Sequence, residues 1–157
     1  DSCPTHLGFV HIGPGDCCYY FSGKNSVVDK SWTDASDYCN NTLSGVSGYI
    51  VRLAEVYDDN GCCNTQEFMQ IITKTDLYTW LGASRTGFNK WTWQYSGEDF
   101  PILSSLWSWN QPDNTGDNQN CLAAMMVNNP NGNFSRAYFD DGYCDLHYPF
   151  VCQIFKK

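Results

Sequence analysis

Apolar residues in the first half of the chain recur with the period of an α-helix. In residues 31–39, one face collects residues at spacings of three and four: Trp32, Ala35 and Cys39. Ser31 precedes this run, and its hydroxyl can accept a backbone N–H bond at the start of a helix. A second run, over residues 64–74, has the same period in its apolar residues: Phe68, Ile71 and Ile72. The pattern predicts two helices, one over each run.

The remaining apolar runs are short and rich in aromatic and β-branched residues, which is typical of strands. The sequence predicts them at residues 18–21, 78–83, 91–95, 121–127, 136–139 and 148–155. Residues 96–120 have no helical period and are rich in Gly, Pro, Asn and Ser. A loop of that length in a compact domain is often functional. Helices early in the chain and strands late in it predict an α+β fold.

Composition limits what such a domain can bind. With 157 residues the chain has the size of one domain, and we expect a single domain over residues 1–157. The formal net charge of −8 disfavours nucleic acid, because phosphate binding needs clustered Lys and Arg. No apolar run approaches the ~20 residues that span a bilayer, so membrane insertion is not expected. The chain begins at Asp1 without an apolar leader, and we expect that a signal peptide has been removed.

Nine cysteines indicate an oxidising, extracellular environment, because cytosolic thiols are kept reduced. A zinc site would need C-x-x-C or C-x-x-x-x-C pairs answered by a second pair, and the sequence has neither. The cysteines lie at long intervals apart from two adjacent pairs, Cys17-Cys18 and Cys62-Cys63. We therefore expect disulfides and a secreted protein.

An ordered set of residues resembles the C-type lectin-like domain family. The set consists of Cys3-Pro4, Cys18–Phe21, Trp32, Ala35, Cys39, Trp80-Leu81-Gly82, Trp107 or Trp109, Gln111-Pro112-Asp113, Cys121, Asp140-Asp141, Cys144 and Phe150-Val151-Cys152. The match covers essentially the whole chain. It implies a C-type lectin-like fold, in which two helices pack on antiparallel sheets beside a long irregular ligand-binding loop. In size and cysteine content the chain also resembles secreted lectins of marine invertebrates, including bivalve molluscs.

The resemblance also implies how disulfides staple the domain. It implies three pairs: Cys3 with Cys18, Cys39 with Cys152, and Cys121 with Cys144. Cys17 is the less favoured partner of Cys3. The cysteines left over are an odd set, Cys17, Cys62 and Cys63. One bridge from Cys17 to Cys62 or Cys63 would leave a single cysteine per chain, which predicts a disulfide-linked dimer; the alternative is one free buried cysteine.

In this family the sugar site is a calcium ion whose open coordination positions are taken by vicinal sugar hydroxyls. Calcium prefers six to eight oxygen ligands, so the site gathers carboxylates and side-chain amides. The resemblance implies calcium as the cofactor, bound by five side chains: Gln111, Asp113, Gln119, Asp140 and Asp141. The predicted sugar-binding set contains the same five residues together with Asn120 and His147. The order of Gln111 and Asp113 around Pro112 resembles the class that binds galactose and N-acetylgalactosamine.

Two departures from the family pattern affect the expected calcium affinity. The family usually has Glu two residues before the cysteine equivalent to Cys121, often followed by Asp, whereas this chain has the neutral Gln119 and Asn120. Asp140 stands where the family has Asn, and Asp117 could contribute if the loop is reshaped. Because ligand charge tunes calcium affinity, we expect weaker binding than at a fully charged site. A sugar could also be held without the ion, by direct hydrogen bonds.

Galactose binders of this family often place a Trp just after the Gln-Pro-Asp motif, to stack on the apolar face of the sugar. Here Asn114-Thr115-Gly116 follows the motif instead. The nearest aromatic substitutes are Tyr138, Tyr143, His147 and Tyr148, although burial in strands is the more common fate of such residues. An N-acetyl group on the sugar would help, because its methyl group can pack on an aromatic ring.

These observations predict a glycan-binding protein and not an enzyme. The histidines His6, His11 and His147 lie far apart, and the sequence has no Gly-x-Ser-x-Gly or His-Glu-x-x-His motif. The alternative is a protein-binding or ice-binding member of the same fold, whose usual mark is a degraded calcium set. The usual role suggested for such secreted lectins is microbial recognition in innate immunity.

Overall fold

The computed structural model describes residues 3–13, 15–57, 68–69, 71, 78–100, 107, 118–128 and 135–155. Its named helices are η1 (Thr5–Leu7), η2 (Ser22–Asn25), α1 (Trp32–Asp37), η3 (Tyr38–Leu43) and α2 (Ser44–Ser47). Its strands are β1 (Phe9–His11), β2 (Cys18–Phe21), β3 (Ile50–Leu53), β4 (Tyr78–Gly87), β5 (Lys90–Trp93), β6 (Asp99–Phe100), β7 (Cys121–Asn128), β8 (Ser135–Gly142) and β9 (Val151–Phe155). The predicted α+β class is confirmed.

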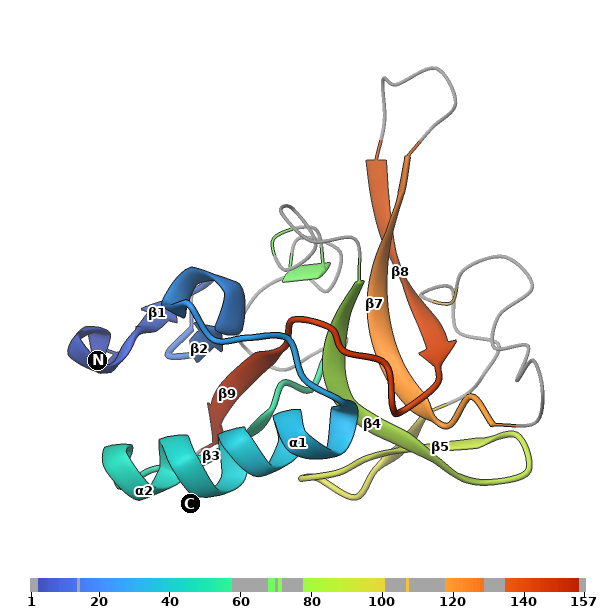
Figure 1. The fold of residues 1–157 in the computed structure, drawn as a ribbon, viewed down its shortest axis with the longest axis horizontal. Coiled ribbons are helices and arrows are strands. Elements are labelled where there is room, and N and C mark those ends of the chain that lie inside the picture. The colour runs from blue at the N-terminus through green and yellow to red at the C-terminus, as the bar shows by residue number, and fades with distance from the viewer. Residues whose placement is uncertain are drawn as a thin grey trace.

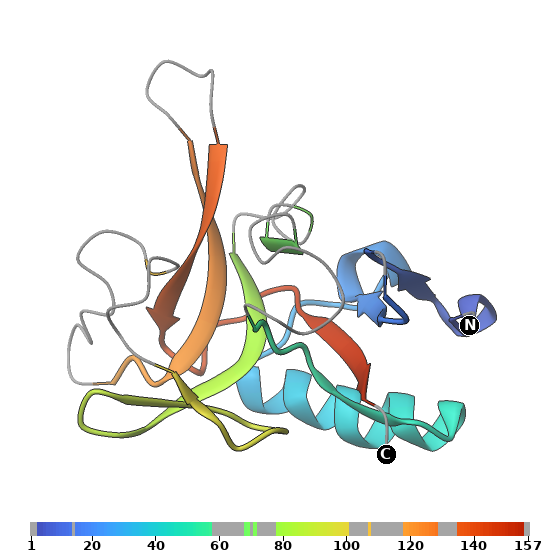
Figure 2. The same ribbon diagram turned by 180° about the vertical axis from the view of Figure 1, so that it is seen from behind.

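The strands form two antiparallel sheets. One has four strands in the order β1-β2-β9-β3, and the other has five in the order β6-β5-β4-β7-β8. A bridge between Trp80 and Phe150 joins them at β4 and the start of β9. Figure 1 shows the segment from α1 to α2 lying along β3 and β9, while the β7–β8 hairpin extends away from it. Figure 2 shows the same arrangement from behind.

The first helix begins where the sequence predicts and ends later. The Ser31 hydroxyl accepts the backbone N–H of Asp34 at 3.2 Å, so the predicted cap is confirmed. The helical chain then continues through η3 and α2 to Ser47, beyond the predicted end at residue 39. Tertiary contacts hold this extension, because Leu43 is buried and the Ser44 hydroxyl accepts the Val51 N–H at 2.9 Å. Within the described residues, no helix is long and apolar enough to cross a membrane.

The other predicted elements agree with the structure to different degrees. Most of the predicted helix over residues 64–74 lies outside the described residues; Phe68, Met69 and Ile71 are helical, but Ile71 is exposed and not on a buried face. The predicted strands are confirmed with shifted ends, and the last begins at Val151 instead of residue 148. The sequence pattern did not predict β1, β3 and β6.

Trp80 and Gly82 on β4 lie where the two sheets are packed together. The Trp80 side chain is fully buried and donates its indole N–H to the carbonyl oxygens of Lys30 at 3.0 Å and Leu146 at 3.3 Å. The Gly82 N–H donates to the Ala54 carbonyl at 2.8 Å. A Cβ atom on Gly82 would lie 2.6 Å from the Leu53 carbonyl oxygen, so only glycine permits this approach.

Glu55 anchors the turn that follows β5. Its buried carboxylate accepts the backbone N–H groups of Tyr95 and Ser96 and the hydroxyl of Tyr57. Burial raises the pKa of Glu55, and these hydrogen bonds oppose the shift. The hydrogen bonds to Tyr95 and Ser96 connect the segment after β3 to the β5–β6 hairpin. Trp91 and Trp93 of this hairpin are buried in the core.

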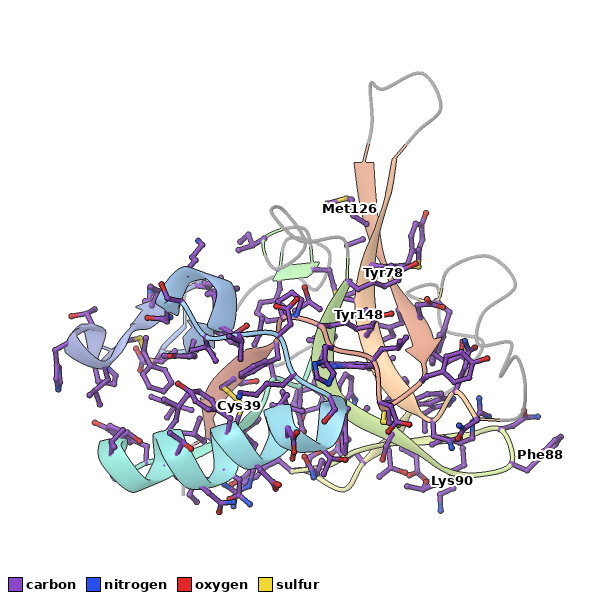
Figure 3. The ribbon with its side chains drawn as sticks, viewed as in Figure 1. Cys39, Tyr78, Phe88, Lys90, Met126 and Tyr148 are labelled. Atoms are coloured by element: carbon purple, nitrogen blue, oxygen red, sulfur yellow. A yellow bond between two sulfur atoms is a disulfide. The ribbon has the colours of Figure 1, made fainter. Side chains whose placement is uncertain are left out.

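The three disulfides that the resemblance implies are confirmed: Cys3–Cys18, Cys39–Cys152 and Cys121–Cys144. The second joins η3 to β9, and Figure 3 labels Cys39 beside the helix. Cys17 also takes part in a disulfide, whose partner lies outside the described residues. Cys62 and Cys63 both lie outside them as well.

Candidate functional site

The β7–β8 ladder brings several predicted site residues to one end of the five-stranded sheet. Its terminal pair is Cys121 with Gly142, so Gln119 and Asn120, which precede β7, lie at the end where β8 finishes. Asp141 is the penultimate residue of β8 and pairs with Leu122. The predicted residues Gln111 and Asp113, and also Asp117, lie outside the described part of the chain.

Asp140 and Asp141 face opposite sides of the sheet, because side chains alternate along a strand. Asp141 pairs with Leu122, which belongs to one hydrophobic cluster, and Asp140 pairs with Ala123, which belongs to the other. The Asp141 side chain is fully buried, whereas Asp140 is half-buried. The structure therefore brings Asp141, but not Asp140, to the face that carries Trp91 and Trp107.

Arg85 is a site residue that the sequence analysis missed. Its Nη2 atom donates to Oδ2 of Asp141 at 3.5 Å, and its backbone N–H donates to the Asn120 carbonyl at 2.9 Å. The guanidinium carbon lies 5.0 Å from the ring centroid of Trp91, its cross-strand partner on β5. No motif singles out an isolated Arg, and β4 extends beyond its predicted end at residue 83.

Three buried N–H groups lie on the face of the sheet that carries Arg85 and Trp91. Trp107 forms a bridge with Phe139, and its ring lies 5.2 Å from that of Trp91. The Nε atom of Arg85 and the indole N–H groups of Trp91 and Trp107 are buried, and none has a hydrogen-bond acceptor among the described residues. A cation site needs the opposite, a set of acceptor oxygens.

The Asp140 face carries an aromatic cluster. The rings of Tyr78 and Tyr148 stack at 5.1 Å, and Trp80 lies 4.7 Å from Tyr148 on the same face. Figure 3 shows Tyr78 and Tyr148 side by side in front of the sheet. Burial, and in second place the negative charge of Asp140, raise the pKa of the Tyr78 hydroxyl. Tyr138 lies two residues before Asp140 on β8 and so faces the same side.

Two further predicted residues lie in the segment that joins β8 to β9. His147 is exposed, and Tyr143 is half-buried. Near the end of this segment, Tyr148 forms an antiparallel bridge with Lys30, which precedes α1. Of the aromatic substitutes predicted for a sugar platform, Tyr138 and Tyr148 therefore belong to the Asp140 face.

The described residues do not fit a calcium site. They contain no group of three or more His, Cys, Asp or Glu side chains that could hold a metal ion. The Asp141 carboxylate is buried against a guanidinium, and Gln119 supplies no charge. Domains that bind calcium collect several charged oxygens around one point, and the described residues at this end of the sheet contribute one carboxylate, Asp141, which is paired with Arg85.

Comparison with known families decides the classification. The family model described as the lectin C-type domain matches residues 28–154. The chain belongs to the C-type lectin domain family. Members of this family are not enzymes, and they usually bind calcium.

Individual relatives agree with this assignment. The chain is 26% identical over 152 residues to a lectin of the newt Pleurodeles waltl, with 89% of this chain and 74% of the relative covered. Among solved structures it is similar to the C-type lectin CEL-I from Cucumaria echinata, with TM-score 0.71, 16% identity and all of both chains covered. It is also similar to the C-type lectin domain of murine dendritic cell inhibitory receptor 2, solved in complex with an N-glycan, with TM-score 0.69, 17% identity, and 99% of this chain and all of the other covered.

Proposed function

We propose that this domain binds carbohydrate, with terminal galactose or N-acetylgalactosamine as its ligands, and does not catalyse a reaction. The observation that carries the proposal is the lectin C-type match over residues 28–154. The murine receptor domain that is similar in fold was solved with a bound N-glycan, which supports the ligand class. The preference for galactose-type sugars rests on the order of Gln111 and Asp113 around Pro112.

The proposed sugar site lies at the end of the β7–β8 ladder and in the preceding segment, which contains the Gln111-Pro112-Asp113 motif. Gln119 and Asn120 directly precede β7, at the end of the ladder where β8 finishes with Asp141 and Gly142. The amide side chains of Gln119 and Asn120 can accept hydrogen bonds from sugar hydroxyls and donate hydrogen bonds to them. The tyrosines of the Asp140 face and the exposed His147 offer apolar ring surface for a sugar that extends beyond the loop.

A glycan array tests the proposal. We expect the protein to bind glycans that end in galactose or N-acetylgalactosamine. We expect it to bind the same glycans in a buffer with calcium and in a buffer with a chelator. Arrays read in both buffers separate direct recognition from recognition through an ion. If no glycan is bound in either buffer, the proposal fails and a protein ligand becomes the better explanation for this fold.

We further propose that the protein is secreted and forms a disulfide-linked dimer. Cys17 is already engaged in a disulfide. If its partner is one of Cys62 and Cys63, the other is left to join two chains, which gives the common two-fold symmetry. Bivalence suits a lectin, because linking two weak sites can raise avidity by ~10²–10⁴ on a suitably spaced surface.

Denaturing gels with and without reductant test the dimer. We expect a band at twice the chain mass of 17.8 kDa without reductant and a single-chain band with it. Single Cys62→Ser and Cys63→Ser variants identify the linking residue, because only one of them should abolish the dimer band cleanly. Monomer in both lanes, with one titratable thiol per chain, would rule the covalent dimer out.

A further inference from the structure

A buried carboxylate requires a positive partner. The Asp141 side chain has no exposed surface, and an ionised carboxylate without a partner is very costly in the interior. The family resemblance implies calcium as that partner. In the structure the guanidinium of Arg85 lies at the carboxylate instead, 3.5 Å from Oδ2.

The surroundings hold Arg85 in this position. Its guanidinium lies over the ring of Trp91, and its backbone is fixed by the hydrogen bond to Asn120. Its side chain is only 15% exposed, so its charge is itself largely removed from water and depends on Asp141. Arg85 and Asp141 therefore neutralise each other within the fold.

We propose that Arg85 is the resident cation of this site. Its guanidinium takes the place beside Asp141 that a calcium ligand set would give to the ion, Asp141 does not bind calcium, and this end of the β7–β8 ladder keeps its structure without metal. The inference rests on the ion pair and not on the identity of the sugar, so it is tested without a glycan.

A calcium ion could reach Asp141 only by displacing Arg85 or by lying next to it. Displacement would leave the largely buried guanidinium without its carboxylate, over a Trp91 ring whose indole N–H is a donor and not an acceptor. The second arrangement would place like charges together in a buried site. Both arrangements are unfavourable, so the ion pair between Arg85 and Asp141 is preferred over calcium binding.

The test is thermal unfolding of the whole chain, followed in a chelator and in millimolar calcium. Asp141→Asn is expected to show the same response to calcium as the wild type, because Asp141 is not a ligand. Arg85→Met is expected to lower the unfolding midpoint by roughly 10 °C, because it removes the guanidinium that lies 3.5 Å from the buried Asp141 carboxylate. The Arg85→Met/Asp141→Asn double variant, which removes both charges, should recover part of that loss.

Lys90→Met is the matched control, because Lys90 pairs with Asp99 at 3.7 Å on the neighbouring strand with both side chains more than half exposed. Its midpoint should hardly change. Figure 3 shows Lys90 near the β4–β5 turn, away from Tyr78 and Tyr148. Two results overturn the proposal: a calcium-induced rise of the wild-type midpoint that is lost in Asp141→Asn, or a double variant no more stable than Arg85→Met. If Asp141→Asn does not fold, the double variant replaces it in the calcium comparison.

Discussion

Replacing Cys39 and Cys152 together by Ala is expected to lower the free energy of unfolding by about 5 kcal/mol. This bridge closes a loop with a sequence separation of 113, the longest among the disulfides between described residues. Long loops lose the most chain entropy in the unfolded state when they are closed. Both cysteines are also fully buried in the cluster that contains Val51 and Phe150, so their loss removes packing as well.

The Cys3→Ala/Cys18→Ala double variant is the matched comparison for this prediction. Its bridge has a sequence separation of 15, so the same entropy model predicts a loss of about 3 kcal/mol. Denaturant unfolding of both variants measures the two losses under identical conditions. A loss for the Cys39–Cys152 variant no greater than that for the Cys3–Cys18 variant would show that loop closure is not the dominant contribution.

The fold could be predicted where local pattern and tertiary structure agree. The helix start at Ser31 followed from a capping residue, and β2 followed from the aromatic run Cys18–Phe21. The helix end did not follow, because residues 40–47 are rich in Asn, Ser and Gly and have weak helix propensity. Burial of Leu43 and the hydrogen bond from the Val51 N–H to the Ser44 hydroxyl hold that segment helical, and both are contacts with other parts of the fold.

The candidate site could be predicted only in part, because some of its features depend on strand pairing and not on local sequence. A motif can identify Asp140 and Asp141 together, but strand alternation sends their side chains to opposite faces, and only the pairing register with Leu122 and Ala123 shows which is buried. Arg85 could not be found from sequence. Its role arises from the pairing of β4 with β5 and β7, which places a single Arg against a carboxylate 56 residues away.

Asp113→Ala is expected to abolish glycan binding or weaken it strongly, while the unfolding midpoint of the ligand-free protein stays nearly unchanged. Asp113 belongs to the Gln-Pro-Asp motif on which the sugar class rests, and its carboxylate would accept hydrogen bonds from sugar hydroxyls. Loss of such a charged acceptor removes binding energy without removing core packing. The control is Asp37→Ala, because Asp37 is an exposed carboxylate at the end of α1.

Glycan binding by these two variants and the wild type tests the central claim most directly. Titration calorimetry with galactose and N-acetylgalactosamine, in a chelator and in calcium, measures the affinity of each protein. We expect full binding by the wild type and Asp37→Ala. For Asp113→Ala we expect an affinity at least about 100-fold lower, which corresponds to the loss of a charge-assisted hydrogen bond. Wild-type affinity in Asp113→Ala, or no sugar binding by the wild type, would contradict it.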